Sequence, residues 1–299
     1  MRKDVEFRTS DGVTLRGWHY LPDPRKGRVP TVVMAHGFSA TKEVFLDRYA
    51  ALFASAGIGV LVYDHRNLGA SDGQPRQEID PWQQVRDYRD AITFAETLPE
   101  TDIDRIGIFG SSYSGGHVFV VGATDRRVKC VVAQVPFVSG LRNGPRIVRG
   151  DHMKVLRQQF DADRRDRAAG KPPVMIAVVA PDGMPCAMAT SDSYAFKVNV
   201  ADKYASTWIN ECTLRSVEMF VEYDVSAYVP HVSPTPLMIV VAMEDHLTVT
   251  DITLQAYESA LQPKKLVMVK GGHFQAYLDH FEVAGGSARD WFVEHLLKA

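Results

Sequence analysis

The chain has 299 residues, of which 45% are hydrophobic and 23% are charged, and its formal net charge is −2. That length suffices for one large domain with a buried core, and the composition is ordinary for a globular protein. The near-neutral charge gives no electrostatic reason to expect binding to nucleic acid or to an anionic membrane, so we expect neither partner.

The cysteines and the N-terminus both bear on the compartment. Cys130, Cys186 and Cys212 are far apart and odd in number, and they form neither a metal-binding pattern nor a disulfide framework. The first residues lack the apolar stretch of a signal peptide, and no segment approaches the roughly 18 apolar residues of a membrane helix. We therefore expect a cytoplasmic protein, and the sequence leaves open whether it forms a homo-oligomer.

The first half of the chain alternates expected strands and helices. In order, we expect a β-hairpin over 5–8 and 14–20, a strand over 31–35, a helix from about 42 to 56, a strand over 59–63, and a helix that begins at Pro81. Asp80 is a suitable N-cap for this last helix. Five apolar residues of this helix recur at helical spacing and should face the core of the domain: Trp82, Val85, Tyr88, Ile92 and Ala95.

Residues 106–116 read Ile-Gly-Ile-Phe-Gly-Ser-Ser-Tyr-Ser-Gly-Gly, an apolar run that ends in small residues. This pattern is typical of a nucleophile elbow, in which a strained turn between a strand and a helix carries a serine. Ser112 fits best because Gly110 lies two residues before it. Ser114, which stands where a second glycine is usual, remains an alternative, whereas Ser111 would place a bulky ring in the turn. A small-residue turn without chemistry is the other interpretation.

Residues 128–135 form another expected strand, and residues 140–229 then break the alternation. Within this insertion we expect helices over 141–167 and 206–223, and a hairpin with strands over 174–180 and 184–188. A lid is common at this place, between the elbow and the strand that carries the acid. We expect an apolar substrate pocket to be lined by Met175, Met184, Met188, Trp208 and Phe220, although packing of the lid on the core is the alternative.

Two apolar strands are expected near the C-terminus, over 236–242 and 266–270. The first precedes Glu244 and Asp245, and the second precedes His273. Serine, acid and histidine thus follow in the order expected of a hydrolytic triad on a parallel sheet. We favour Asp245 because it lies three residues after the small Ala242, and Glu244 is the alternative.

His273 is favoured as the base over His280, which should lie in a helix over 274–281. His36, which follows the strand over 31–35, is expected to hydrogen-bond backbone and to take no proton.

Together these motifs resemble the α/β-hydrolase superfamily over residues 1–139 and about 230–299. Residues 110–115 resemble the elbow of dienelactone-hydrolase-like and X-prolyl-peptidase-like esterases. The segments 231–238 and 271–274 resemble a subgroup with fungal polyketide transferases and bacterial lactone hydrolases. The resemblance implies an α/β-hydrolase fold: a mostly parallel central sheet flanked by helices, with the inserted lid over 140–229.

The resemblance also implies roles for individual residues. Ser112 would be the nucleophile, His273 the general base, and Asp245 the carboxylate that orients the imidazole. The backbone N–H groups of Phe38 and Tyr113 would form the oxyanion hole. This chemistry needs no cofactor and no metal, so we expect none.

We therefore expect a serine hydrolase that cleaves a small-molecule carboxylic ester or lactone, with a fairly large apolar substrate, through an acyl-enzyme. Acyl transfer, including polyketide transfer, uses the same triad and stays open. An X-prolyl-type peptidase is less favoured because it usually needs an acidic anchor for the peptide amine. A non-catalytic ligand-binding relative is the remaining alternative.

Overall fold

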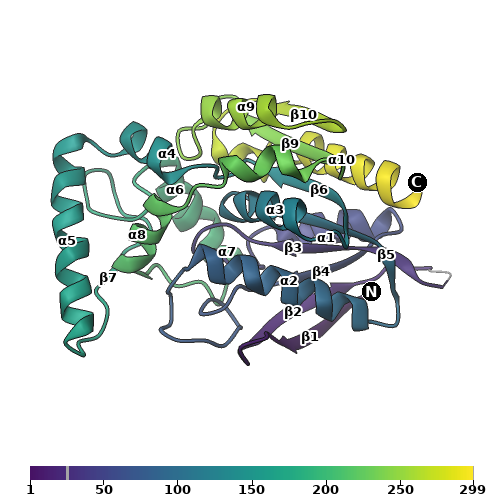
Figure 1. Ribbon diagram of the computed structural model, residues 1–299, viewed down its shortest axis with the longest axis horizontal. Helices are drawn as coiled ribbons and strands as arrows, with labels where there is room; N and C mark the ends of the chain where they lie inside the picture. The colour runs from purple at the N-terminus through teal and green to yellow at the C-terminus, as the bar shows by residue number, and fades with distance from the viewer. Residues whose placement is uncertain (25–26, 299) are drawn as a thin grey trace.

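The computed structural model describes residues 1–24 and 27–298. Within them, eight strands form the main sheet, in the order β1-β2-β4-β3-β5-β6-β9-β10 (Figure 1). From β4 to β10 neighbouring strands are parallel, whereas β1 and β2 join one edge antiparallel. The strand bounds are β1 Arg2–Arg8, β2 Thr14–Tyr20, β3 Val29–Ala35, β4 Gly59–Tyr63, β5 Thr101–Ser111, β6 Val128–Gln134, β9 Leu237–Ala242 and β10 Lys264–Val269.

The central parallel strands are buried because helices cover both faces of the sheet. Every residue of β3, β4 and β9 is buried, which explains why these strands read as continuous apolar runs. Helices α2, α3 and α9 lie on one side together with the short helix η2, and α1 and α10 lie on the other (Figure 1). Their bounds are α1 Leu46–Ser55, α2 Pro81–Thr97, α3 Tyr113–Thr124, η2 Ser226–Val232, α9 Thr250–Ser259 and α10 Phe281–Phe292, after which the π-helix η4 Val293–Leu297 follows.

The mostly parallel sheet flanked by helices confirms the predicted fold class, but two details of the first half differ from expectation. Helix α1 begins at Leu46 and not near residue 42, because Phe45 has a φ of 62° in the left-handed region. Trp82 is 40% exposed and does not join the core face of α2. Its ring instead contacts Tyr223 and Tyr228 of the chain that follows the insertion's last helix.

The segment between β6 and β9 stands at one end of the sheet, on the left in Figure 1. Its two ends meet, because Ser139 and Asp224 form an isolated β-bridge. The elements in between are α4 Gly140–Ile147, α5 Gly150–Ala168, β7 Met175–Ile176, α6 Ser191–Phe196, the π-helix η1 Lys197–Ala201, α7 Asp202–Tyr204, β8 Cys212–Thr213 and α8 Leu214–Glu222.

Three expectations for this segment are wrong. The predicted hairpin does not form: β7 pairs antiparallel with β8, and Met184–Met188 is not a strand although the amides of Ala187 and Met188 donate to Ala177 and Val178. The helix expected over 206–223 is confined to α8, and a break also separates α4 from α5. None of the helices within the described residues has the length and apolarity to cross a bilayer.

Candidate active site

Ser112 occupies a strained turn between β5 and α3, with a φ of 57° and a ψ of −116°. The turn is so tight that a Cβ on Gly110 would lie 2.0 Å from the backbone oxygen of Ser114. A Cβ on Gly115 would lie 2.7 Å from Pro136, and one on Gly116 would lie 2.3 Å from the Phe137 oxygen. These contacts explain why the elbow motif requires glycine on both sides of the serine.

The structure brings Ser112, His273 and Asp245 together. The Nε2 atom of His273 lies 3.0 Å from the Ser112 hydroxyl, and its Nδ1 atom lies 2.7 Å from the Asp245 carboxylate. The three residues follow the ends of β5, β10 and β9, which are parallel strands that share one edge of the sheet. Ser112 keeps 9% of its surface exposed, whereas His273 and Asp245 are buried.

The Asp245 carboxylate is held in its ionised form. One oxygen accepts hydrogen bonds from the amides of Leu247 and Thr248, both at 2.8 Å, and the other also accepts from the Thr248 hydroxyl at 2.9 Å. Burial raises the pKa of Asp245, but the attraction and hydrogen bond of His273 and the bonds from Thr248 outweigh it, so the pKa lies below its ordinary value. Glu244, the alternative acid, is exposed and makes no contact with His273.

The other residues considered for the triad lie elsewhere. The helix expected over 274–281 does not form, because only the short 3-10 helix η3 His273–Ala276 begins there. His280 lies beyond it as the N-cap of α10. Ser114 is fully buried: its hydroxyl donates to the His36 carbonyl and contacts the Nε2 atom of His65 at 2.8 Å. The Ser111 hydroxyl lies 2.6 Å from the phenol of Tyr277.

The amides of Phe38 and Tyr113 are free to bind an oxyanion, since neither donates to a protein acceptor within the described part of the chain. The Phe38 N–H belongs to the same planar peptide as the Gly37 carbonyl, so a contact that holds this carbonyl also orients the N–H. The carbonyl of that peptide, on Gly37, contacts the Nδ1 atom of His36 at 3.0 Å. Because the Nε2 atom of His36 accepts from the amide of His65, Nδ1 carries the hydrogen and donates it.

His36 therefore acts on backbone, as the sequence led us to expect. Burial lowers the pKa of His36 to about 4, so the ring is neutral at physiological pH. A neutral ring with one donor and one acceptor satisfies both backbone partners at once. This fixes the plane of the peptide that joins Gly37 to Phe38.

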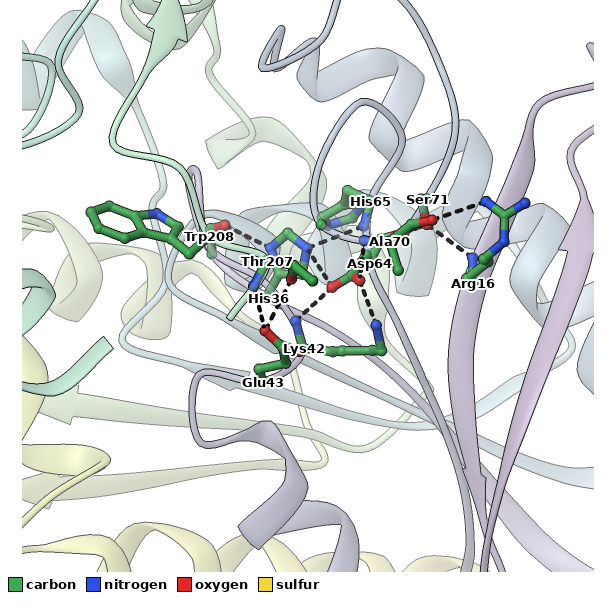
Figure 2. Close-up of polar contacts among 12 residues, drawn as sticks. Arg16, His36, Lys42, Glu43, Asp64, His65, Ala70, Ser71, Thr207 and Trp208 are labelled. Carbon is green, nitrogen blue, oxygen red and sulfur yellow. Dashed lines mark hydrogen bonds and ion pairs between the residues drawn. The ribbon is translucent and has the colours of Figure 1, made fainter. Parts of the chain in front are cut away.

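A buried carboxylate behind this loop fixes its far end (Figure 2). Asp64 accepts from the amide of Lys42 at 2.7 Å, from the Lys42 ammonium at 2.5 Å, and from the amide of Ala70 at 3.0 Å. The same ammonium lies 4.9 Å from the centre of the Trp18 ring. Both charged side chains are nearly inaccessible, so each is the partner that makes burial of the other tolerable.

A pocket with about 410 Å³ of empty space, including its mouth, opens beside Ser112 and His273. Its lining is mainly apolar, from the loop after β3, from the insertion and from the segment after His273: Phe38, Val44, Leu46, Met188, Phe196, Phe274 and Tyr277. The lining also includes Lys197. A mainly apolar lining beside a serine hydroxyl is suited to contact with an apolar group of a ligand.

Of the insertion residues expected in this pocket, only Met188 lines it. Met184 is 61% exposed and Met175 also faces solvent. Trp208 is half-buried outside the lining, and its indole N–H donates to the Ser39 carbonyl at 2.7 Å. Phe220 packs behind the elbow, where it stacks on Tyr113 and contacts Phe38 edge-on. Trp208 and Phe220 therefore pack the insertion against the core, which was the alternative to lining the pocket.

Sequence reasoning missed Phe274, Tyr277, Phe196 and Lys197. The first two follow His273 within five residues, and that proximity could have identified them. Phe196 and Lys197 carry no motif, and only the fold brings them to Ser112. Among the described residues, no group of three or more His, Cys, Asp or Glu side chains is placed to hold a metal ion.

Comparison with known proteins agrees with this geometry. A family model described as X-Pro dipeptidyl-peptidase (S15 family) matches residues 11–275. The chain belongs to this family. Its fold matches the solved structure of the α/β hydrolase GrgF from Penicillium sp. sh18, with a TM-score of 0.86 and 28% identity over 99% of each chain. The expected α/β-hydrolase relationship is thereby confirmed.

Curated relatives narrow the type of protein within the family. The chain is 34% identical to a thiohydrolase of Eupenicillium brefeldianum, over 91% of this chain and 87% of that protein. It is 32% identical to the polyketide transferase ATR5 of Stachybotrys chlorohalonatus, over 91% of this chain and 90% of that protein. The chain is thus an α/β hydrolase of the thiohydrolase and polyketide-transferase type.

The buried pair behind the loop predicts a large loss of stability in Lys42→Met. The substitution leaves the Asp64 carboxylate buried without its cation, and breaking a buried pair in this way costs about 3–5 kcal/mol. Urea unfolding should show this loss. The matched control is Arg146→Met, which breaks an exposed ion pair with Asp251 and should cost less than about 1 kcal/mol. Equal losses in the two variants would contradict the prediction.

Proposed function

We propose that the protein is a serine hydrolase that cleaves a carboxylic ester, thioester or lactone through an acyl-enzyme on Ser112. The observation that carries the proposal is the continuous contact from Asp245 through His273 to the Ser112 hydroxyl, at 2.7 and 3.0 Å. Such a chain of contacts is what activation of a serine hydroxyl requires. The two free amides belong to Phe38, in the loop after β3, and to Tyr113, the first residue of α3 and the neighbour of Ser112.

The steps follow from the geometry. The Ser112 oxygen attacks the acyl carbon while its proton moves to Nε2 of His273, and the carbonyl oxygen becomes an oxyanion that accepts from Phe38 and Tyr113. Collapse of this intermediate breaks the bond to the alcohol or thiol, which receives the proton from His273. Water then attacks the acyl-enzyme by the same route, and the carboxylic acid and the free serine result. Asp245 holds the ring and stabilises its cation.

The pocket favours an apolar acyl chain over a peptide. Its described lining residues include no carboxylate that could bind a peptide amine, and Lys197 would disfavour a second cation. The apolar rings and Met188 suit an alkyl or aryl chain. Peptidase action on an X-Pro substrate, which the name of the family model describes, is therefore the less favoured reaction for this chain.

Acyl transfer is the second candidate, because a relative that is 32% identical is named a polyketide transferase. The first half of the reaction would be unchanged. In the second half an alcohol or thiol would take the place of water, and His273 would remove the proton of that acceptor instead. The triad geometry serves both reactions equally, so the acceptor must be identified by experiment.

The nucleophile is tested with Ser112→Ala. This variant should lose esterase and thioesterase turnover almost completely, by about 10⁶-fold if the residue acts as triad serines do elsewhere. It should also resist a fluorophosphonate probe. Ser114→Ala, the matched control two residues away, should retain most turnover because its hydroxyl serves the His36 carbonyl. Labelled and active Ser112→Ala protein would refute the proposal and favour a non-catalytic or different role for the site.

The acid is tested with two isosteric substitutions in adjacent residues. Asp245→Asn should lower kcat by about 10⁴-fold, since a carboxamide cannot stabilise the imidazolium or hold the required tautomer. Glu244→Gln should leave kcat unchanged, because Glu244 is exposed and lies outside the triad. Steady-state kinetics on a p-nitrophenyl ester measure both, and the reverse pattern would show that Glu244 is the acid.

Product analysis decides between hydrolysis and transfer. We expect a panel of p-nitrophenyl esters, acyl thioesters and lactones to yield free acids as the main products in buffer, with turnover highest for medium-length apolar acyl chains. The same reactions with an added alcohol or thiol acceptor show how far transfer competes. Dominant formation of the acyl–acceptor product, at acceptor concentrations far below that of water, would instead establish the protein as a transferase.

A further inference from the structure

The carbonyl of Ser39 receives two hydrogen bonds from the inserted segment. The ammonium of Lys197, at the start of η1, donates at 3.0 Å, and the indole N–H of Trp208 donates at 2.7 Å. Ser39 lies in the loop after β3, directly after Phe38. The insertion therefore contacts the loop that supplies one of the two free amides beside Ser112.

The conformation of Ser39 explains why its carbonyl needs such support. The Ala40 amide donates to the Gly37 carbonyl at 3.3 Å, so residues 37–40 form a turn with Phe38 and Ser39 at its centre. Ser39 has a φ of 43°, in the left-handed region where glycine is usual and where other residues cost about 1–2 kcal/mol. Two donors on its carbonyl offset this cost and fix the orientation of the turn.

A second contact secures the same loop a few residues further on. The Glu43 carboxylate accepts from the amide and hydroxyl of Thr207, at 3.1 and 2.9 Å, and from the hydroxyl of Ser206 at 3.3 Å (Figure 2). Residues 206–208 thus contact the loop through Glu43 and through Ser39.

Burial of Lys197 to make such a contact costs folding free energy. Its side chain is 2% exposed, and burial lowers the pKa of its ammonium to about 7. Besides the Ser39 carbonyl, its partner is the face of the Trp208 ring, whose centre lies 5.1 Å away. Among the residues whose side chains the structure describes, no carboxylate pairs with this amine, and an amine buried in this way costs stability that an apolar side chain of similar size would not. This cost points to a role other than holding the fold together.

We propose that Lys197 and Trp208 are positioning residues that hold the turn over residues 37–40, and with it the Phe38 amide, in the orientation that completes the oxyanion hole. The insertion then contributes to the completion of the catalytic centre through these two donors. Neither side chain needs to touch the reacting atoms. The inference rests on the proposed acyl-enzyme chemistry at Ser112.

The test uses Lys197→Met and Trp208→Phe, each of which removes a donor and keeps most of the side-chain volume. Loss of a whole oxyanion donor lowers kcat by about 10²–10³-fold, so a misplaced donor should lower kcat by about 10–100-fold, with little change in KM. Affinity for a trifluoromethyl ketone, which forms a tetrahedral adduct with the serine, should fall by the same factor. Affinity for the carboxylic acid product should not.

Matched controls and a stability measurement separate positioning from unfolding. Lys154→Met changes an exposed lysine of α5 and Trp82→Phe changes a tryptophan of α2, and both should keep the parent kcat. Lys197→Met should melt at the same or a higher temperature than the parent, because it removes the cost of burying an amine.

Two results would overturn the inference. One is a kcat within twofold of the parent in both Lys197→Met and Trp208→Phe, while Ser112→Ala is inactive. The other is a fall in kcat that follows a fall in melting temperature, with unchanged relative affinity for the ketone and the acid. Activity that survives in Ser112→Ala would instead refute the proposed function, so the two failures can be told apart.

Discussion

The site depends on the backbone conformation of Ser112. A non-glycine residue with a φ of 57° and a ψ of −116° persists only if its surroundings hold it there. The amide of Ser112 donates to Gln134 of β6, and its carbonyl accepts from Gly115 and Phe137. Gly37 lies so close to Ser112 that only glycine fits there, because a Cβ on residue 37 would lie 2.8 Å from the Cβ of Ser112. The sheet thus fixes the serine and the loop after β3 together.

This constraint is also why so much of the site could be predicted from the sequence. Strands buried on both faces read as continuous apolar runs, and the residues that follow them meet at one edge, so Ser112, Asp245 and His273 could be placed near one another without coordinates. Glycine at 110 and 115 marks the turn because no other residue fits. The catalytic roles of these residues, unlike their positions, stay a prediction.

The insertion was predicted poorly, for physical reasons. Its strands β7 and β8 have two residues each and pair across more than thirty residues of chain, so neither carries a period that a sequence can reveal. Outside the insertion, the amphipathic spacing of α2 wrongly assigned Trp82 to the core face, whereas its ring contacts Tyr223. Lys197 had no signal at all, because a lysine in a short apolar stretch is ordinarily solvated and only the packing of η1 against the loop after β3 buries it.

Three buried histidines around the elbow set a limit on the conditions that the fold tolerates. Burial lowers the pKa of His36 to about 4 and that of His117 to about 3, and it places the pKa of His65 well below its ordinary value of 6.5. The unfolded chain takes up protons at these rings as the pH falls below about 6.5, whereas the folded chain does not until much lower pH. Proton uptake therefore favours the unfolded chain throughout that interval. Burial of the neutral His36 ring, which contacts the backbone beside the active site, and of the two neighbouring rings should therefore lower the free energy of unfolding as the pH falls.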